Sequence, residues 1–215
     1  MNNPPVPDPA PIEPASGIAE MRAKMHDMGG GRHLIDGAAP ILGYILGFAV
    51  HGITTGIIAA VLTALVVGAV RIRHGDRPKV VGASAALVIV FSAIAATTGE
   101  GRDFFLPPLI LYAVLAVACA ISSATATPLT LPICRRLRIE PTPPADPAAR
   151  VRLHRRVTAA WAVFGALHVL IMGPVYLAGN VVLLGTFALI LNKPALLAAI
   201  AGTWVWVRHG PIAAR

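Results

Sequence analysis

Long apolar stretches alternate with short polar segments along this chain. The first stretch runs from Gly37 to Val70 without a formally charged residue, over 34 residues. One helix of that length would measure about 51 Å, whereas roughly 20 residues already cross a hydrocarbon core of about 30 Å. Because Gly52 and Gly56 bracket a natural turn, we predict two membrane helices here, over about 34–51 and 54–70.

Four further apolar stretches predict helices over about 80–97, 104–126, 157–177 and 186–207. Asn192, Lys193 and Pro194 interrupt the last stretch, so residues 179–192 are interpreted as a loop, a half-helix or the first turns of a kinked span. The sequence therefore predicts an all-α fold. It is a polytopic transmembrane helix bundle of about six helices within residues 29–210, with a basic, proline-rich loop at 128–156.

The first 28 residues differ in character from this bundle. Residues 1–16 are rich in proline and predict a disordered tail. Residues 17–28 place Met21, Met25 and Met28 on one helical stripe, which predicts a short surface helix or a linker. A basic start followed by an apolar core and a cleavage site is absent, so we expect the first apolar stretch to be a retained span.

Composition and charge support a membrane location. Hydrophobic residues make up 56% of the chain and charged residues 13%, against about 25% charged in a typical soluble domain. The net charge of +8 does not indicate nucleic acid, because 16 of the 18 lysines and arginines lie in segments that the six-helix layout places on one side. Since such residues favour the cytoplasmic side, we predict both termini in the cytoplasm and a multi-pass protein of the bacterial cytoplasmic membrane.

The densest polar segment lies on the opposite, outer side, where Glu100, Arg102 and Asp103 occur within four positions. Either carboxylate can pair with Arg102, and Asp103 is placed to cap the next helix. One interpretation is a ligand or ion site at the outer mouth of the bundle. The other is a capped turn at the membrane interface.

Two further residues are candidates for the same ligand or ion site. Lys193 either marks a broken helix that lines a cavity, as in transporters, or extends to the outer interface. His168 lies within a span, where it serves in proton or ligand binding or in a hydrogen bond between helices. Arg32 and Asp36 are spaced as a pair at the entry of the first helix. No spacing indicates a metal site, no motif requires a cofactor, and no catalytic residue is assigned.

Four segments together resemble an actinobacterial family of small polytopic membrane proteins of unknown function. They are TGEGRDFFLP at 98–107, GGRHLIDGAAP at 30–40, AWAVF at 160–164 and PVYLAGN at 174–180. The resemblance covers roughly residues 28–209, and the TGExRDFFLP-type segment is its most specific part. The AWAVF run and the closing Arg208-His209 are more distantly similar to the bacterial intracellular septation protein A family, whose members are linked to the envelope and division.

This resemblance implies a multi-pass fold and adds weight to a functional role for Glu100, Arg102 and Asp103. It names no activity. The chain departs from the near family at Pro108, where a glycine is usual, and at Lys193, whose ligand role is therefore not implied by it.

Three functions are open at this point. The first is a non-enzymatic, envelope-associated interaction factor with the lipid bilayer and a membrane-protein partner or second copy as its partners. The second is a small transporter or carrier that uses the charged outer turn. The third is an intramembrane enzyme acting on a lipid or isoprenoid, with Glu100 or Asp103 as general acid.

Overall fold

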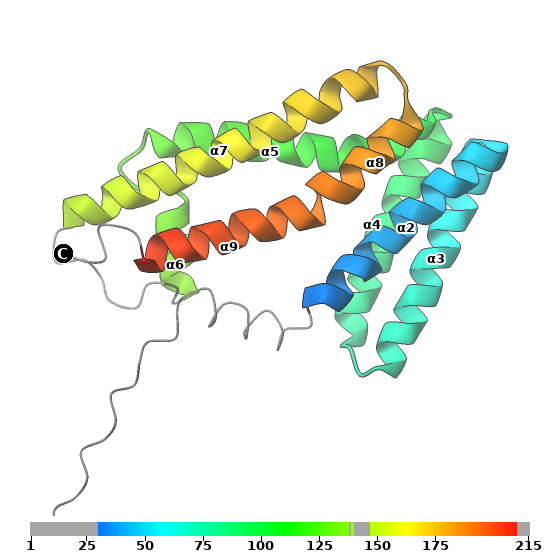
Figure 1. Cartoon of the computed structure of the whole chain (residues 1–215), viewed down its shortest axis with the longest axis horizontal. Helices are drawn as coiled ribbons and strands as arrows, with labels where there is room; N and C mark the ends of the chain where they lie inside the picture. Colours follow the sequence, from blue (N-terminus) through cyan, green and yellow to red (C-terminus); the bar gives the residue numbers. More distant parts are fainter. Residues whose placement is uncertain (1–29, 138, 140–146, 210–215) are drawn as a thin grey trace, which may run out of the picture.

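A computed structural model describes residues 30–137, 139 and 147–209, and the side chains of 30–36 and 209 lie outside this description. The predicted tail at 1–28 and most of the central part of the basic loop fall outside the described residues. Within them the chain is built of helices (Figure 1).

The first three helices form one group of antiparallel neighbours: α2 (Gly30–His51), α3 (Ile53–Arg73) and α4 (Pro78–Thr98). The predicted helices at 34–51 and 54–70 correspond to α2 and α3, which are separated at Gly52, where φ is +79°. A Cβ built on Gly47 would lie 2.6 Å from the backbone oxygen of Thr55. Glycine at this position therefore lets the two backbones approach each other closely.

A short 3₁₀ helix, η1 (Gly101–Phe105), leads into the second group. It continues into α5 (Leu106–Ser123), which packs along the 31-residue α7 (Pro147–Leu177). In the sequence, α6 (Thr130–Arg136) lies between α5 and α7. It is a short helix inside the segment predicted as a basic loop. The hydroxyl of Thr130 on α6 donates to the backbone oxygen of His154 on α7 at 3.0 Å, and this hydrogen bond docks α6 onto α7.

The last span consists of two helices, α8 (Val181–Leu191) and α9 (Lys193–His209). The predicted helix at 186–207 covers parts of both, and the chain bends at Asn192, whose φ and ψ are −71° and −84°. Asn180 begins α8, because its side chain accepts a hydrogen bond from the backbone N–H of Leu183 at 3.0 Å.

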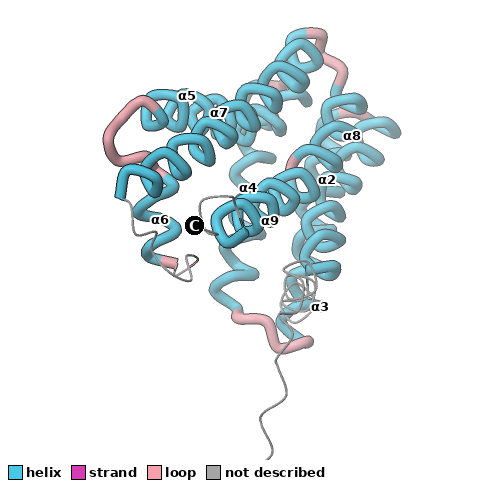
Figure 2. The backbone as a smooth tube through the Cα atoms, turned by 60° about the vertical axis from the view of Figure 1, so that its left-hand side comes forward, coloured by secondary structure: helices cyan, strands magenta, loops and turns pink. Residues whose placement is uncertain are grey.

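The two groups meet at one end of the molecule. In Figure 1, α2, α3 and α4 stand on the right, α5, α7 and α9 extend to the left, and α8 lies beside α2 where the groups join. The same arrangement is visible after rotation in Figure 2. Buried aromatic side chains fill this junction, with Tyr44 stacked on Phe104 at 4.1 Å between ring centroids and edge-on to Phe105.

Five helical segments of the described chain are long and apolar enough to cross a membrane. They are Ile53–Arg73, Pro78–Thr98, Gly101–Ser123, Pro147–Leu177 and Val181–Arg208. Gly37–His51, the part of α2 with described side chains, is a shorter apolar helix, so about six helices are consistent with the structure. The predicted fold class, an all-helical multi-pass membrane bundle, is confirmed.

Candidate functional site

The charged turn at 100–103, which the sequence predicts on the outer side and which is called the outer turn below, begins where α4 ends. Gly99 has φ of +75°, a left-handed conformation that closes the helix and is favourable for glycine. The hydroxyl of Tyr44 on α2 then donates to the backbone oxygen of Gly101 at 2.7 Å. A Cβ on Gly101 would overlap the ring of Phe48, so glycine lets η1 pack directly against α2.

Asp103 is buried, with 7% of its surface exposed, and accepts a hydrogen bond from the hydroxyl of Tyr176 on α7. The prediction that Asp103 caps the next helix is wrong. Helix α5 begins after Phe105 without a side-chain cap, because η1 separates Asp103 from its first turn. The carboxylate instead joins two parts of the chain that are 73 residues apart.

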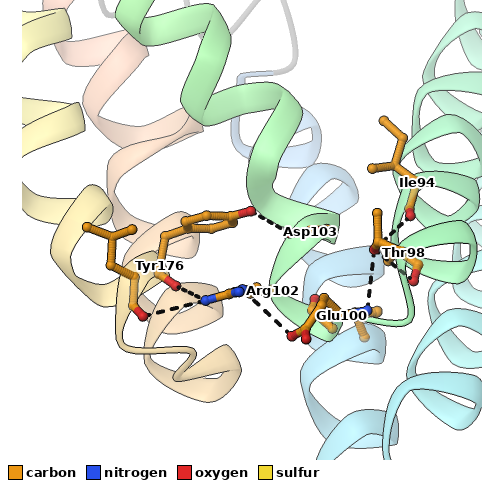
Figure 3. Close-up of polar contacts among 10 residues, drawn as sticks. Ile94, Thr98, Glu100, Arg102, Asp103 and Tyr176 are labelled. Atoms are coloured by element: carbon orange, nitrogen blue, oxygen red, sulfur yellow. Dashed lines mark hydrogen bonds and ion pairs between the residues drawn. The ribbon is translucent and has the colours of Figure 1, made fainter.

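Arg102 lies beside this contact at the end of α7 (Figure 3). Its Nη1 donates to the backbone oxygens of Tyr176 at 3.3 Å and Leu177 at 3.5 Å, and its guanidinium lies 5.2 Å from the centre of the Tyr176 ring. The last carbonyls of a helix lack partners within the helix and carry partial negative charge, which a cation stabilises. Glu100 completes the group, with its Oε2 at 3.7 Å from Arg102 Nε.

The three charged residues of the outer turn therefore lie together, as their spacing in the sequence suggests, and bind other parts of the protein. Asp103 and Arg102 hold the end of α7, and Glu100 pairs with Arg102. This geometry favours the interpretation of a structural turn that fixes α7 against η1.

A cavity of about 500 Å³ lies next to η1. Helices α2, α3 and α4, together with the α8–α9 break, contribute its walls. Phe104 and Phe105 from η1 line one end of it. Its volume falls within the range of roughly 300–1,000 Å³ that is usual for small-molecule sites.

The lining of this cavity is largely apolar, with four polar side chains: Arg71, Ser84, Asn192 and Lys193. Arg71 donates from Nε to Oδ2 of Asp76 at 2.6 Å. Asn192 has a buried side-chain oxygen without a hydrogen-bond partner among the described residues. Such an atom favours occupation of the cavity by a polar group, because a buried acceptor without a partner is costly.

Lys193 reaches α2 from the start of α9. A Cβ built on Gly37 would overlap the Lys193 side chain from Cδ to Nζ, so the lysine passes directly over this glycine. Of the two interpretations made from the sequence, this placement favours a broken helix that lines a cavity. The interruption Asn192-Lys193-Pro194 forms both the bend and part of the wall.

His168 lies neither in the outer turn nor in the lining of the cavity. It is buried between α7 and α5, where its ring stacks on Tyr112 at 3.6 Å between centroids. Neither ring nitrogen has a hydrogen-bond partner among the described residues, so the expected bond between helices is not seen there. Arg32 and Asp36 belong to the first turns of α2, and their side chains lie outside the described residues.

Sequence reasoning did not single out Tyr44 and Tyr176, which anchor the outer turn. Their signal was present, since a tyrosine in an apolar span usually has a partner for its hydroxyl. It also did not single out the buried group of Thr130, His154 and Thr158, in which the two threonine hydroxyls lie 2.8 Å apart. His154 and Thr158 lie one turn apart on α7, and the docking of α6 brings Thr130 to them, which no local pattern in the sequence indicates.

The long apolar helices define the chain as an integral membrane protein of the multi-pass, helix-bundle class. It belongs to the family described as "Protein of unknown function (DUF3159)", whose model matches residues 28–213. No curated protein matches the chain, and no solved structure does.

Proposed function

We propose that this chain is a non-enzymatic membrane protein that binds a lipid-like molecule in the cavity between α4 and the α8–α9 break. The observation that carries the proposal is the cavity itself, which joins an apolar lining to polar side chains at a bend in a membrane helix. Broken membrane helices commonly form binding sites, because the bend brings backbone and polar groups to membrane depth.

The apolar part of the lining suits a molecule that is already dissolved in the bilayer. Leu87 of α4, which lines the cavity, is 56% exposed, and its neighbours Ile89 and Val90 are also exposed. Side chains of this kind on a membrane helix are compatible with lipid tails. A ligand with an acyl or isoprenoid tail would enter from the bilayer without crossing water.

A binding role agrees better with the geometry than catalysis does. The enzyme hypothesis assigned Glu100 or Asp103 as general acid, yet neither residue lines the cavity, and Asp103 accepts a hydrogen bond from Tyr176. The transporter hypothesis relied on the outer turn, whose charged groups hold the end of α7. A carrier would instead bind its substrate in the cavity. Lys193 is the residue that the predicted ligand or ion site and the cavity have in common.

The proposal also includes the membrane in which the protein acts and its partners. We infer an envelope-associated role in the cytoplasmic membrane of an actinobacterium, supported by the resemblance of the TGExRDFFLP-type segment and the distant similarity to septation protein A. A membrane-protein partner or a second copy of the chain remains a prediction. The basic residues between α5 and α7 are the surface on which we expect that contact.

The cavity is tested by filling it. Ala85 lines the cavity on α4, whereas Ala86 is exposed and lies outside the lining. In native mass spectrometry of the full chain released from detergent, we expect A85W to lose a lipid that the unmodified protein retains. A86W, which adds the same side chain one position away, should keep it. Equal lipid retention in both variants would show that the cavity is not the binding site.

A further inference from the structure

The polar side chains of the cavity gather toward one end. Arg71 and Ser84 lie near the α3–α4 turn, whereas Phe91 lies two helical turns further along α4. Seven residues of helix separate Ser84 from Phe91, a rise of roughly 10 Å. Phe104 and Phe105 line the end near η1. The cavity thus has a polar end near the basic α3–α4 turn and an aromatic end near the outer turn.

Lys193 belongs to the polar end. It passes over Gly37, which precedes the outer end of α2 at His51 by 14 residues, or roughly 21 Å. In a hydrocarbon core of about 30 Å, this position lies in the half of the bilayer nearer the basic turn. A lysine at this depth extends toward the nearer interface, where lipid headgroups are.

Among the described side chains at this end, basic residues outnumber acidic ones. Lys193 and Arg71 line the cavity, and Arg73, Arg77 and Lys79 surround the nearby turn and are exposed. Asp76 is an acidic residue of this turn and pairs with Arg71. Basic pockets between membrane helices on the positively charged side bind anionic headgroups. The lysine ammonium has three N–H donors, so it can keep a contact within the protein and still donate to a headgroup oxygen.

From this arrangement we propose that the ligand is an amphiphile with an anionic phosphate headgroup, held by Lys193 and Asn192, with its tail directed toward Phe104 and Phe105. The inference rests on the proposed function and specifies its ligand. Lys193 supplies the charge that a phosphate needs. The side-chain amide of Asn192 supplies a neutral polar contact, and its buried oxygen accepts from a headgroup hydroxyl.

The headgroup is tested by titrating the full chain with defined lipids in native mass spectrometry. The panel contains phosphatidylglycerol, zwitterionic phosphatidylcholine and a polyprenyl phosphate. We expect phosphatidylglycerol or the polyprenyl phosphate to bind about fivefold more tightly than phosphatidylcholine, since one basic residue near a membrane surface contributes about 1 kcal/mol. Whichever of the two anionic lipids binds more tightly identifies the source of the phosphate.

Matched variants assign the preference to Lys193. K193Q should abolish it and K193R should retain it, whereas K79Q removes the same charge from a lysine of the turn outside the cavity and should lower it much less. N192D should weaken the binding of the anionic lipids, because it adds a negative charge to the cavity lining. Equal binding of anionic and zwitterionic lipids, or equal losses in K193Q and K79Q, would overturn the headgroup assignment.

The two proposals fail in different ways. If A85W releases every lipid and K193Q changes no preference, the cavity binds lipid and the phosphate assignment is wrong. If A85W and A86W retain lipid equally, the proposed function itself is wrong. Circular dichroism and gel filtration of each variant show whether the fold is intact, and K193R tests the charge with little change in side-chain length.

Discussion

Individual residues show how buried polar groups are used in this bundle. Asp103 has a carboxylate at the junction of the two helix groups, and a charge in such a place is costly unless it is hydrogen-bonded. The Tyr176 hydroxyl supplies that bond, and Arg102 places a cation near by. Arg102 and Asp103, which look available for chemistry in the sequence, thus bind the end of α7 in the structure.

Removal of the Tyr176 hydroxyl tests this role. Y176F leaves the buried Asp103 carboxylate without its partner, so we expect the free energy of unfolding to fall by about 1–3 kcal/mol. The loss should be smaller when D103N is already present, because the remaining amide is neutral. Unfolding by sodium dodecyl sulfate in mixed micelles measures both values.

The control for this prediction is Y112F. The Tyr112 ring stacks on His168, and that stack survives the loss of a hydroxyl. A Y176F variant that is as stable as Y112F would contradict the assigned role of the Asp103 hydrogen bond.

At the scale of elements, glycines set how closely the helices pack. A Cβ on Gly165 of α7 would lie 2.8 Å from the backbone oxygen of Tyr112 on α5, whereas a Cβ on Gly173 of the same helix meets nothing within 4 Å. The first position therefore determines the separation of α5 and α7, and the second does not.

Alanine at these two glycines gives a matched pair. We expect G165A to destabilise the bundle by about 1–3 kcal/mol, because it forces α5 and α7 apart. G173A should cost clearly less than G165A, because its methyl group meets no neighbouring helix, although the following Pro174 ring offsets the better helix propensity of alanine. The same unfolding measurement compares them, and a G165A variant no less stable than G173A would refute the close contact.

The sequence predicted the long helices well and the short ones poorly. The stretches that became α3 and α4 are apolar over the length of a span, so composition alone indicates them. Helix α6 has seven residues, and its stability depends on the contact between Thr130 and α7, which is not a local property. The bend at Asn192 was indicated by its neighbours Lys193 and Pro194, but its geometry depends on α2.

The candidate site was predicted only in part, because it too depends on contacts between distant parts of the chain. The charges at Glu100, Arg102 and Asp103 are visible in the sequence, but their use depends on the end of α7. The cavity could not be predicted, because its lining consists of single residues spaced along helices of both groups. Lys193 is visible in the sequence because it interrupts an apolar stretch, and in the structure it also lines the cavity.

At the scale of the whole molecule, the basic residues predict which ends of the helices face the cytoplasm. The α3–α4 turn should lie inside and the α7–α8 turn outside. In a chain with Cys119 and Cys134 replaced by alanine, we expect Asn180→Cys to react with a membrane-impermeant maleimide on intact spheroplasts. His74→Cys should react only after the membrane is opened, and labelling of both from outside would contradict the topology.

The contact between Lys193 and Gly37 also bears on how the protein assembles during synthesis. A lysine within a span opposes insertion, by up to about 2.5–3.5 kcal/mol at the centre of the bilayer. The α8–α9 segment emerges from the ribosome after α2, and its lysine lies over α2 in the folded protein. We therefore expect stable insertion of the α8–α9 span to depend on α2 already being in the bilayer, so that these helices close the bundle together.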